Sequence, residues 1–545
     1  MSIKKRILGA SVAIMLFAGC VGCSGGGGGA STGSEPNSGG ADLTTTSIYI
    51  NSQSGNDKND GTTPERALKS LDSMSYRDVL PGTTIYLTGK FEGVLSFNGS
   101  GTQEEPITIT SYGDQRAVID GNGAATAISI SDQNWITIDN LEITLTAKPD
   151  ELARNAVFFS ATGGVMQGLT VKNCYIHDVV ATKLGQYAAG DYYNSYYASS
   201  AIGFRYLLED TDEQNKFDTV TISNCVIENI IGCGIRFHDI NKYADYRGEN
   251  PYFSNIIIED TTIDTTAGDG IILQCCNAPI VRRCKVFRVG VLDDKSTQNY
   301  HCAVWACATR SPLYEYNEIA YTKYVCGDGQ AFDTDWGSSG TAIFQYNYTH
   351  DNEGGVLLRH MDYKAIYRYN ISVNDGVIKK DDGSYGKRAL FFHSSPHLDV
   401  KETMYCYNNI FLNNVCDTYI AQAYQPYPVA ASYDTSTNVF KNNVFVSLNN
   451  PWWGTVTVLD GNCYFRLDGA TTAPARDTNG YAGDPMFAST ITQTPASFSD
   501  AVSAFALQSS SPLLGKGVAL SEEELFLFCG KNILGEIAGS NIGPY

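Results

Sequence analysis

Short runs of alternating apolar and polar residues fill most of the chain. An alternation with a period of two predicts strands that bury one face and leave the other wet. Turns rich in glycine and asparagine separate these runs and bring the chain back to the same kind of strand every few tens of residues. This organisation predicts one solenoid of parallel strands. Clear examples are Ser47-Ile48-Tyr49-Ile50, Ile107-Thr108-Ile109 and Ala331-Phe332-Asp333-Thr334-Asp335.

A unit centred on asparagine recurs along the chain. Neighbouring units lie mostly between 23 residues (Asn347 to Asn370) and 38 residues (Asn370 to Asn408) apart, which fits one coil plus its loop. Asparagine tolerates a left-handed backbone and can bond its copy in the next coil, so the repeat predicts a stacked ladder at one turn. The units are Ile138-Asp139-Asn140, Val171-Lys172-Asn173, Ile222-Ser223-Asn224, Glu315-Tyr316-Asn317, Gln345-Tyr346-Asn347, Arg368-Tyr369-Asn370, Tyr407-Asn408 and Lys441-Asn442-Asn443.

Segments at both ends of the repeats are predicted to cap the solenoid. A proline at a helix start and leucines on one face predict a short helix near Pro64 to Ser73 over the first coil. The segment from Gly483 to Tyr545 is expected to close the other end. Such caps keep open strand edges from pairing with other molecules. Two insertions, 181–217 with many tyrosines and 241–253, are expected to wall one face.

The first 46 residues are predicted to direct and tether the protein and not to join the fold. Lys4-Lys5-Arg6 precedes an apolar run, and Ala18-Gly19-Cys20 is typical of a bacterial lipobox. Residues 1–20 are therefore interpreted as a lipoprotein signal peptide with Cys20 acylated, and plain secretion is the alternative. Residues 21–46 are a Gly/Ser-rich tether, and 47–545 are the solenoid. We expect a protein anchored by lipid at a bacterial cell surface or envelope.

Charge and cysteine content narrow the class of partner. The net charge of −20 and pI near 4.7 argue against nucleic acid, because nothing supplies a basic stripe for phosphates. They suit neutral or amino sugars, and we expect a monomer acting on an oligo- or polysaccharide. Cys174, Cys225 and Cys284 each stand at the start of a repeat strand. A buried column of small side chains is the prediction for them, with disulfides as the alternative.

Alignment of the strands that follow successive glycine turns predicts which side chains share the outer face. The aligned strands begin at Ile235, Ile271, Val304, Phe332, Val356, Leu390 and Tyr419, and their first and third positions are apolar or small. These positions are predicted to face inward. The second position adds Arg236, Trp305 and Asp333 to the outer face, and the fourth gives His238, Gln274, Cys307, Asp335, Arg359, His393 and Gln422.

Asp333 and Asp335 are the leading candidates for catalysis. Their Cα atoms are predicted to lie about 6.5 to 7 Å apart on one face, and glycosidases use two carboxyl groups. A second carboxyl and the apolar Trp305 would raise the pKa of one acid, while Arg359 on the next coil would keep the other ionised. The alternative is that both acids only solvate the surface. Gln274, His238, His393 and Arg236 join Arg359 and Trp305 as expected substrate-binding residues.

Asp328 is the third candidate acid. It lies in the turn Gly327-Asp328-Gly329, which matches Gly268-Asp269-Gly270 of an earlier coil and Glu353-Gly354-Gly355 of the next. A role only in forming the turn is the alternative. Asp351 and Glu353 could join Asp328 around calcium, since hard cations need several oxygens. No cofactor is otherwise required. His350 and His360 are expected to be structural residues of turns.

The chain resembles a known superfamily from Ser47 to Tyr545. The order of its N-terminal cap and the phrases Glu105-Pro106-Ile107-Thr108-Ile109 and Ala117-Val118-Ile119-Asp120-Gly121 resemble right-handed parallel β-helix proteins of the pectate-lyase-like superfamily. This resemblance implies an all-β fold, a single right-handed parallel β-helix with a short N-terminal capping helix, and activity on carbohydrate.

Two finer resemblances point to different chemistry. Gly355 to His360 looks like the arginine strand of the alginate-lyase and chondroitinase-B group, which pairs that arginine with a lysine base on the preceding coil. Here the preceding coil offers aspartates and no lysine. Aspartates without lysine resemble a β-helix glycoside hydrolase, and the Asp328-x6-Asp335 spacing is similar to the acid pair of the lacto-N-biosidase family (glycoside hydrolase family 136).

The sequence therefore favours an extracellular glycoside hydrolase that degrades a glycan with an aspartate pair on the outer face of the β-helix. One alternative is a polysaccharide lyase that uses Arg359 with a histidine or tyrosine base. Another is a glycan-binding surface protein without catalysis. Unsaturated products that absorb in the ultraviolet would separate the lyase from the hydrolase, and binding without turnover would select the third.

Overall fold

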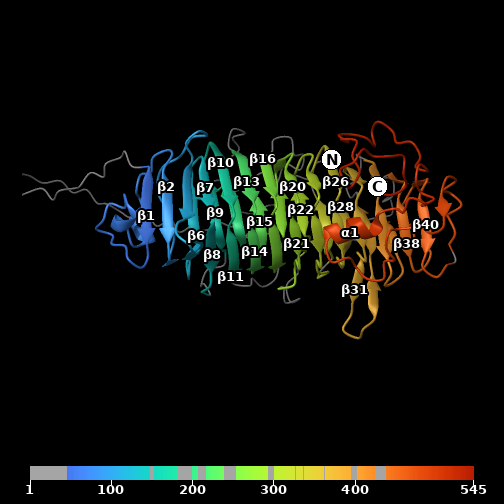
Figure 1. The fold of residues 1–545 in the computed structure, drawn as a ribbon, viewed down its shortest axis with the longest axis horizontal. Coiled ribbons are helices and arrows are strands. Elements are labelled where there is room, and N and C mark those ends of the chain that lie inside the picture. Colours follow the sequence, from blue (N-terminus) through green and yellow to red (C-terminus); the bar gives the residue numbers. More distant parts are fainter. Residues whose placement is uncertain are drawn as a thin grey trace, which may run out of the picture. The chain divides into compact units, whose positions relative to one another are not determined.

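The chain folds as a right-handed parallel β-helix, which confirms the fold predicted from the sequence. The computed structural model describes residues 46–147, 153–181, 199–206, 216–237, 253–292, 300–325, 327–335, 337–360, 363–394, 402–423, 437–469 and 471–545. Its strands form three parallel sheets of 15, 14 and 10 strands, and a typical coil gives one strand to each sheet in turn (Figure 1). The right-handed sense is the one that connections between parallel strands take. The expected lipid anchor at Cys20 and its tether lie outside the described residues.

The 15-stranded sheet, here sheet 1, contains β1 (Ser47–Asn51), β2 (Thr84–Thr88), β4 (Ile107–Ser111), β7 (Ile136–Asp139), β10 (Val165–Lys172), β13 (Lys216–Ser223), β16 (Phe253–Glu259), β19 (Cys276–Asn277), β20 (Ile280–Arg282), β23 (Leu313–Glu315), β26 (Thr341–Gln345), β29 (Lys364–Arg368), β34 (Met404–Tyr407), β37 (Asn438–Lys441) and β39 (Val458–Asp460). The 14-stranded sheet 2 contains β3 (Lys90–Glu92), β5 (Ala117–Asp120), β8 (Leu141–Leu145), β11 (Tyr175–Val179), β14 (Val226–Ile230), β17 (Thr262–Thr266), β21 (Lys285–Phe287), β24 (Glu318–Ala320), β27 (Tyr348–His350), β30 (Ile371–Val373), β35 (Ile410–Asn413), β38 (Val444–Ser447), β40 (Cys463–Arg466) and β41 (Tyr481–Ala482).

The 10-stranded sheet 3 contains β6 (Thr126–Ser131), β9 (Asn155–Ala161), β12 (Ser200–Tyr206), β15 (Cys233–Phe237), β18 (Ile271–Gln274), β22 (Val304–Cys307), β25 (Gln330–Thr334), β28 (Gly355–His360), β33 (Ala389–Ser394) and β36 (Tyr419–Ala423). An antiparallel hairpin of β31 (Val377–Lys379) and β32 (Tyr385–Lys387) stands out from the coils between sheets 2 and 3 (Figure 1).

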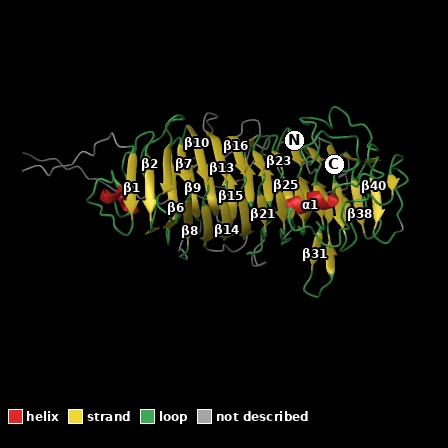
Figure 2. Cartoon of the chain, in the orientation of Figure 1, coloured by secondary structure: helices red, strands yellow, loops and turns green. Residues whose placement is uncertain are grey.

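Among the described residues, helical structure is confined to the N-terminal cap and to the C-terminal segment, whose helix lies along the side of the later coils (Figure 2). The segment expected to form a capping helix near Pro64 to Ser73 forms two 3-10 turns, η1 (Pro64–Arg66) and η2 (Leu71–Met74), of which η2 buries Leu71 and Met74. The α-helix α1 (Phe498–Phe505) begins at Ser497, whose side chain accepts a hydrogen bond from the Asp500 N–H. Its buried Ala501 and Phe505 pack in one cluster with apolar residues of sheet 2, including Tyr348 of β27. The C-terminal segment therefore covers the outside of the later coils.

A ladder of buried side chains runs along the turn between sheets 1 and 2. The Asn347 side-chain N–H donates to Asn370 at 3.0 Å, and Asn370 donates in the same way to Asn409 at 3.0 Å. The backbone N–H of each asparagine also donates to the next side chain, at 2.8 Å in both cases. The residue before each asparagine takes the left-handed conformation, with φ of 57° at Tyr346 and 55° at Asn408. The full ladder is Asn317, Asn347, Asn370, Asn409, Asn443, Asn462 and Asp477.

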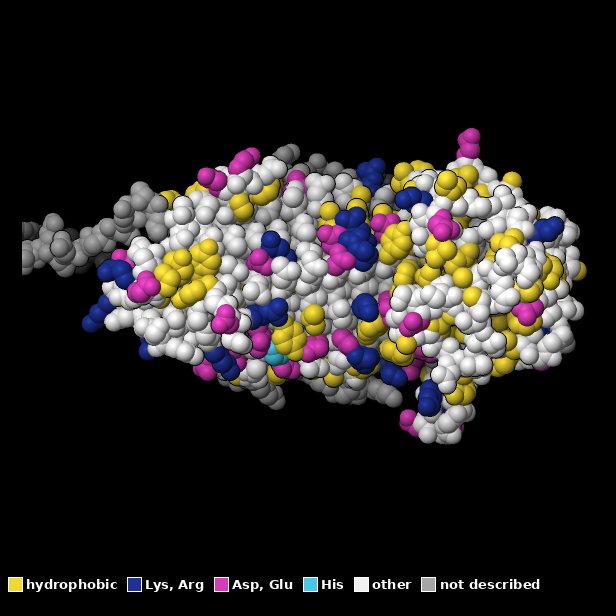
Figure 3. All heavy atoms as spheres, viewed as in Figure 1, with side chains coloured by type: hydrophobic (Ala, Val, Ile, Leu, Met, Phe, Trp, Pro, Cys, Tyr) yellow, Lys and Arg dark blue, Asp and Glu magenta, His cyan; other side chains and the backbone are white. Residues whose placement is uncertain are grey.

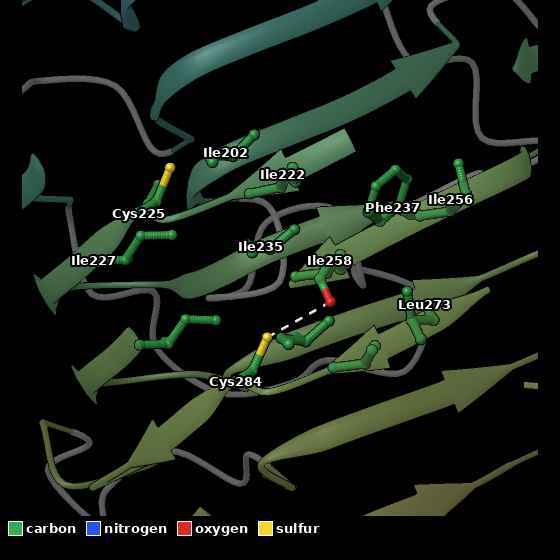
Figure 4. Packing of buried hydrophobic residues seen from close by; sticks show 14 of the residues in the cluster. Ile202, Ile222, Cys225, Ile227, Ile235, Phe237, Ile256, Ile258, Leu273 and Cys284 are labelled. Atoms are coloured by element: carbon green, nitrogen blue, oxygen red, sulfur yellow. Dashed lines mark hydrogen bonds between the residues drawn. The ribbon is translucent and has the colours of Figure 1, made fainter. Parts of the chain in front are cut away.

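Thiols occupy the same position in earlier coils. The Cys284 N–H donates to the side chain of Asn317, which starts the asparagine ladder. The Cys284 thiol lies 3.6 Å from the Ile258 carbonyl oxygen of β16 (Figure 4). The Cys225 thiol lies 3.7 Å from the Val171 carbonyl oxygen of β10. Cys174, Cys225 and Cys284 are buried thiols and form no disulfides. The column predicted from the sequence is therefore present.

Charged side chains of both signs lie interspersed on the face of the molecule seen in Figure 3. Within the described residues, every helix is too short to cross a bilayer. A few large apolar side chains of the C-terminal segment are exposed, notably Leu527 at 71% and Ile537 at 91%.

His350 of β27 is a buried cation between two acids. Its Nδ1 lies 2.9 Å from Asp351 Oδ2, and its Nε2 lies 3.9 Å from Glu318 Oε1. Burial alone would lower the pKa of His350, but the two carboxylates outweigh burial and raise the pKa to about 9. His350 therefore links neighbouring coils, a structural role.

The asparagine ladder should stabilise the fold strongly. Asn370→Ala removes bonds to two neighbouring asparagines and leaves buried N–H and C=O groups unpaired, each of which costs about 1 to 3 kcal/mol. We expect a fall in the free energy of unfolding of about 2 to 4 kcal/mol, measured by urea or thermal denaturation. The control is Asn450→Ala, at an exposed position. Equal stabilities of the two variants would contradict the role of the ladder.

His350 should make stability depend on pH. Its folded-state pKa lies above the unfolded value of 6.5, so its contribution is complete below pH 6.5 and is lost as the pH rises through 9. The contribution is at most about 3 kcal/mol. We expect the difference in melting temperature between wild type and His350→Gln to shrink steadily from pH 6 to pH 10. A difference that stays constant over this range would show that His350 is neutral in the folded protein.

Candidate active site

Sheet 3 carries three outward columns of side chains because each central strand turns two successive residues inward. Ala331 and Phe332 both belong to the core, as do Val356 and Leu357 one coil later. Each coil therefore has three outward positions: the residue before the inward pair, the first residue after it and the third residue after it. In the coil of β25 these are Gln330, Asp333 and Asp335. By strand register, the middle column is Arg236, Ile272, Trp305, Asp333, Leu358, Phe392 and Gln422. The column before the pair is Cys233, Asp269, Cys302, Gln330, Gly355 and Ala389, and the last column includes Gln274, Cys307 and Asp335.

The predicted alignment is correct through Asp335 and wrong after it. Leu357, not Val356, pairs with Phe332, so Arg359 pairs with Thr334 and does not follow Asp335 in its column. Val356, Leu357 and Leu358 are all apolar, so the alternation that fixed the register in earlier strands is missing here. The sequence pattern could not reveal the shift of one residue.

Arg359 and His393 consequently do not lie on the outer face. Arg359 is 1% exposed, and its guanidinium donates to the carbonyls of Tyr363 and Glu402 and to the side chain of Asn438. His393 pairs with Arg359 by register and is 3% exposed, with Nε2 2.6 Å from the Thr455 hydroxyl. Both side chains link sheet 3 to later coils, which corrects their expected place beside the substrate.

Three buried groups meet at the centre of the outer face. The thiol of Cys302 and carboxylate oxygens of Asp328 and Asp333 all lie within 4.8 Å of one another. The Cys302 thiol lies 3.8 Å from Asp333 Oδ2 and 3.5 Å from Gln330 Oε1. Although Asp333 points away from the core as predicted, it is only 4% exposed, so the expectation of a wet surface aspartate is wrong. We call Asp269, Asp328, Asp333, Asp335 and Cys302 the acid cluster.

The surroundings of Asp333 favour its protonated form. Burial raises the pKa of Asp333 well above its usual range, and the charges of Asp335, Asp328 and Asp269 raise it further, while the hydrogen bond from Cys302 opposes them. Its Oδ1 has no hydrogen-bond partner. An acid that keeps its proton while close to other carboxylates is suited to donate that proton.

Asp269 belongs to the cluster and was missed in the sequence. Its Oδ1 accepts a hydrogen bond from the Cys302 backbone N–H at 2.9 Å. Burial raises the pKa of Asp269 to about 6, against the opposing effect of His301. In register, Asp269 corresponds to Gln330 and not to Asp328, so the two Gly-Asp-Gly turns are not equivalent. The sequence did contain a signal for this residue, because Asp269 comes directly before the two residues that face inward in its coil, Gly270 and Ile271.

Asp335 lies in a different environment from Asp333. The Trp305 indole N–H donates to Asp335 Oδ2 at 3.1 Å, and Trp305 pairs by register with Asp333. Asp335 is partly exposed, whereas Trp305 is only 8% exposed. Trp305 therefore provides for Asp335 the contact that was expected from Arg359.

Arg388 secures the turn that carries Asp328. It follows the hairpin of β31 and β32 and donates to the Gly327 carbonyl at 2.8 Å. Its guanidinium lies over the rings of Tyr324 and Phe392, at 4.1 and 4.5 Å from their centroids. The next coil approaches this turn so closely that a Cβ on Gly354 would lie 2.7 Å from the Asp328 carbonyl oxygen.

A cleft of about 810 Å³ lies beside the same turns and the hairpin. Its walls include the partly exposed rings of Tyr321 and Tyr385 and the ion pair of Lys323 with Glu353, at 2.6 Å. Aromatic faces and paired polar groups of this kind suit a polar ring-shaped ligand.

The remaining predicted residues are less central or lie elsewhere. Gln274 is buried next to Cys307, and its Oε1 has no hydrogen-bond partner. Arg236 is also buried and donates to the side chain of Asn155. His238 lies outside the described residues. Gln422, the last member of the predicted fourth position, pairs with Phe392 and so joins the middle column.

Asp328, Asp351 and Glu353, the residues expected to share a calcium ion, do not form one group. Within the described ranges, Cys302, Asp328 and Asp333 are the group close enough to share a metal ion, and Asp351 and Glu353 do not join it. Asp351 pairs with His350, and Glu353 pairs with Lys323 and the Tyr324 N–H.

Comparisons with known proteins agree with this fold. No protein-family model matches the chain. The chain is 26% identical over 509 residues to a lacto-N-biosidase of Bifidobacterium longum subsp. longum, covering 74% of this chain and 29% of that protein. It is 28% identical over 142 residues to the uncharacterized protein YwoF of Bacillus subtilis, covering 25% of this chain and 29% of that protein. The chain thus spans less than a third of either curated relative.

Among solved structures, the GH136 lacto-N-biosidase of Eubacterium ramulus superimposes with a TM-score of 0.52 at 21% sequence identity. The superposition covers 80% of this chain and 67% of that chain. At this level of identity the likeness establishes the β-helix fold. The chain is similar in sequence to one lacto-N-biosidase and in fold to another.

Asp333 should destabilise the protein as the pH rises. Its folded-state pKa lies above the ordinary value of 3.8, so the folded protein loses stability between pH 4 and the raised pKa. Asp333→Asn removes this loss. We expect the variant to melt at a higher temperature than wild type, by a margin that grows from pH 4 to pH 8. Asp114→Asn, at an exposed position, serves as the control, and a variant that melts below wild type at pH 8 would contradict the assignment.

Proposed function

We propose that the protein is a glycoside hydrolase that cleaves a glycosidic bond at the acid cluster. The observation that carries the proposal is the contrast between Asp333, which is buried and has a raised pKa, and Asp335, which is hydrogen-bonded to Trp305 and partly exposed. Two carboxyl groups in contrasting surroundings suit the roles of general acid and of base or nucleophile.

The two acids take complementary roles in this mechanism. Asp333 donates its proton to the oxygen of the leaving sugar, and Asp335 acts on the anomeric carbon either directly or through a water molecule. Asp328, within 4.8 Å of the Asp333 carboxylate, keeps that proton in place by its charge. An arrangement with Asp328 and Asp335 as the reacting pair is the second form of the proposal, because the Asp-x6-Asp spacing is similar to that of the lacto-N-biosidase family.

The substrate class follows from the relatives. Similarity to two lacto-N-biosidases favours a glycan that ends in lacto-N-biose. The cleft beside Tyr321 and Tyr385 offers surfaces for sugar rings outside the bond that breaks, whereas Trp305 is buried and instead bonds Asp335. With Cys20 as a lipid anchor, the enzyme would act on extracellular glycans at the bacterial surface.

The lyase alternative is less well supported. A lyase must neutralise a uronate carboxylate, and Arg359 was the expected group for this. Arg359 instead donates to the carbonyls of Tyr363 and Glu402 and to Asn438, and is 1% exposed. The non-catalytic alternative predicts binding of glycan without turnover.

Asp335→Asn should retain its melting temperature and lose nearly all activity, because general acid–base catalysis is worth about 10² to 10⁴ in rate. Asp333→Asn should lose activity to a similar degree. The assay is release of aryl alcohol from an aryl lacto-N-bioside, followed by a panel of glycans analysed for both hydrolysed and unsaturated products. Asp114→Asn should retain wild-type turnover. If both cluster variants retain it too, the chemistry lies elsewhere, and unsaturated products would select the lyase.

A further inference from the structure

We propose that Cys302, Asp328 and Asp333 bind a divalent transition-metal ion, with zinc the best fit, and that the metal and the glycan exclude one another. The binding site stands on geometry alone. The mutual exclusion rests on the proposed function, since Asp328 and Asp333 would serve both.

The three ligand atoms are already gathered. They lie within 4.8 Å of one another, and the residues are between 2% and 7% exposed. Zinc binds sulfur at about 2.3 Å and carboxylate oxygen at about 2.0 to 2.2 Å, so ligand atoms of a tetrahedral site lie roughly 3.4 to 3.6 Å apart. Side-chain shifts of about 1 Å would close the gap.

Two buried carboxylate oxygens in this cluster lack a hydrogen-bond donor. Asp333 Oδ1 and Asp269 Oδ2 have no partner, and their residues are 4% and 2% exposed. A buried unpaired carboxylate oxygen is costly, and a bound cation satisfies it without a further donor. Four aspartates share this patch, so a doubly charged ion has a strong electrostatic reason to enter.

The donor set selects the class of metal. A thiol is a poor ligand for calcium and magnesium, whereas zinc accepts thiolate and carboxylate together. Three protein ligands leave a fourth position for water, as in open zinc sites. The thiol of Cys302 lies among carboxylates, unlike that of Cys225, which lies in the apolar core.

Cobalt provides a test that does not depend on activity. Chelator-treated protein titrated with Co²⁺ should develop a thiolate-to-cobalt charge-transfer band in the near ultraviolet, and Zn²⁺ should displace it. Cys302→Ala should abolish the band, and Cys225→Ala, the matched buried thiol, should retain it. Absence of the band in wild type, or its survival in Cys302→Ala, would overturn the site.

Asp333→Asn guards against misfolding of the cysteine variant, because the amide has nearly the same shape as the carboxylate it replaces. Zinc affinity measured by calorimetry should fall more than about tenfold in this variant, with unchanged circular dichroism. An affinity equal to that of wild type would remove Asp333 from the ligand set and overturn the site as proposed.

Inhibition tests the second half of the proposal. If the wild-type enzyme hydrolyses an aryl lacto-N-bioside, Zn²⁺ should suppress turnover and chelator should restore it. Metal binding in a protein with no hydrolase activity would leave the metal site standing and defeat the proposed function. Hydrolysis that Zn²⁺ at saturating concentration leaves unchanged would defeat mutual exclusion and leave the proposed function intact.

Discussion

The amide ladder at the turn between sheets 1 and 2 fixes how each coil stacks on the next. Each asparagine bonds both the side chain and the backbone N–H of its neighbour, so a slip of one residue would break several buried hydrogen bonds at once. Since the strands of sheet 2 begin at this turn, their register follows from it. The outward columns of sheet 3, and therefore the meeting of Asp333 with Trp305, depend on coils that are stacked in this fixed way.

The acid cluster differs from the ladder in how completely its buried polar groups are hydrogen-bonded. The ladder pairs nearly every buried polar group, whereas Asp269, Gln274, Gln330 and Asp333 each keep a buried atom without a partner. Such groups lower stability, and they persist where the surrounding structure holds them in place. Unpaired buried polar groups of this kind are typical of functional sites, so the contrast supports this part of sheet 3 as the active site.

Alternation and repeats carried the prediction of the fold, because both report directly on which residues face the core. The same alternation located Asp333 opposite Trp305. The alternation failed at β28, because a continuous run of apolar residues does not show which of them face the core. The predicted register there was therefore wrong by one residue, and Arg359 was misplaced. The repeat also pointed to Asn408, which holds the left-handed turn, while its neighbour Asn409 makes the ladder bonds. Burial of Asp333 and the part played by Asp269 depend on contacts between coils, which no local pattern encodes.

Successive ladder residues are separated by 30, 23, 39, 34, 19 and 15 positions in the sequence, yet the ladder stays continuous. All differences in coil length are therefore absorbed at the other two corners, where the hairpin of β31 and β32 is the clearest case. Loops at these corners can therefore differ in length from coil to coil while Asp333, on β25, stays beside Trp305. Substrate preference can be re-engineered by loop grafting at coils that do not contact the Asp328 turn, because that turn is itself held by Arg388.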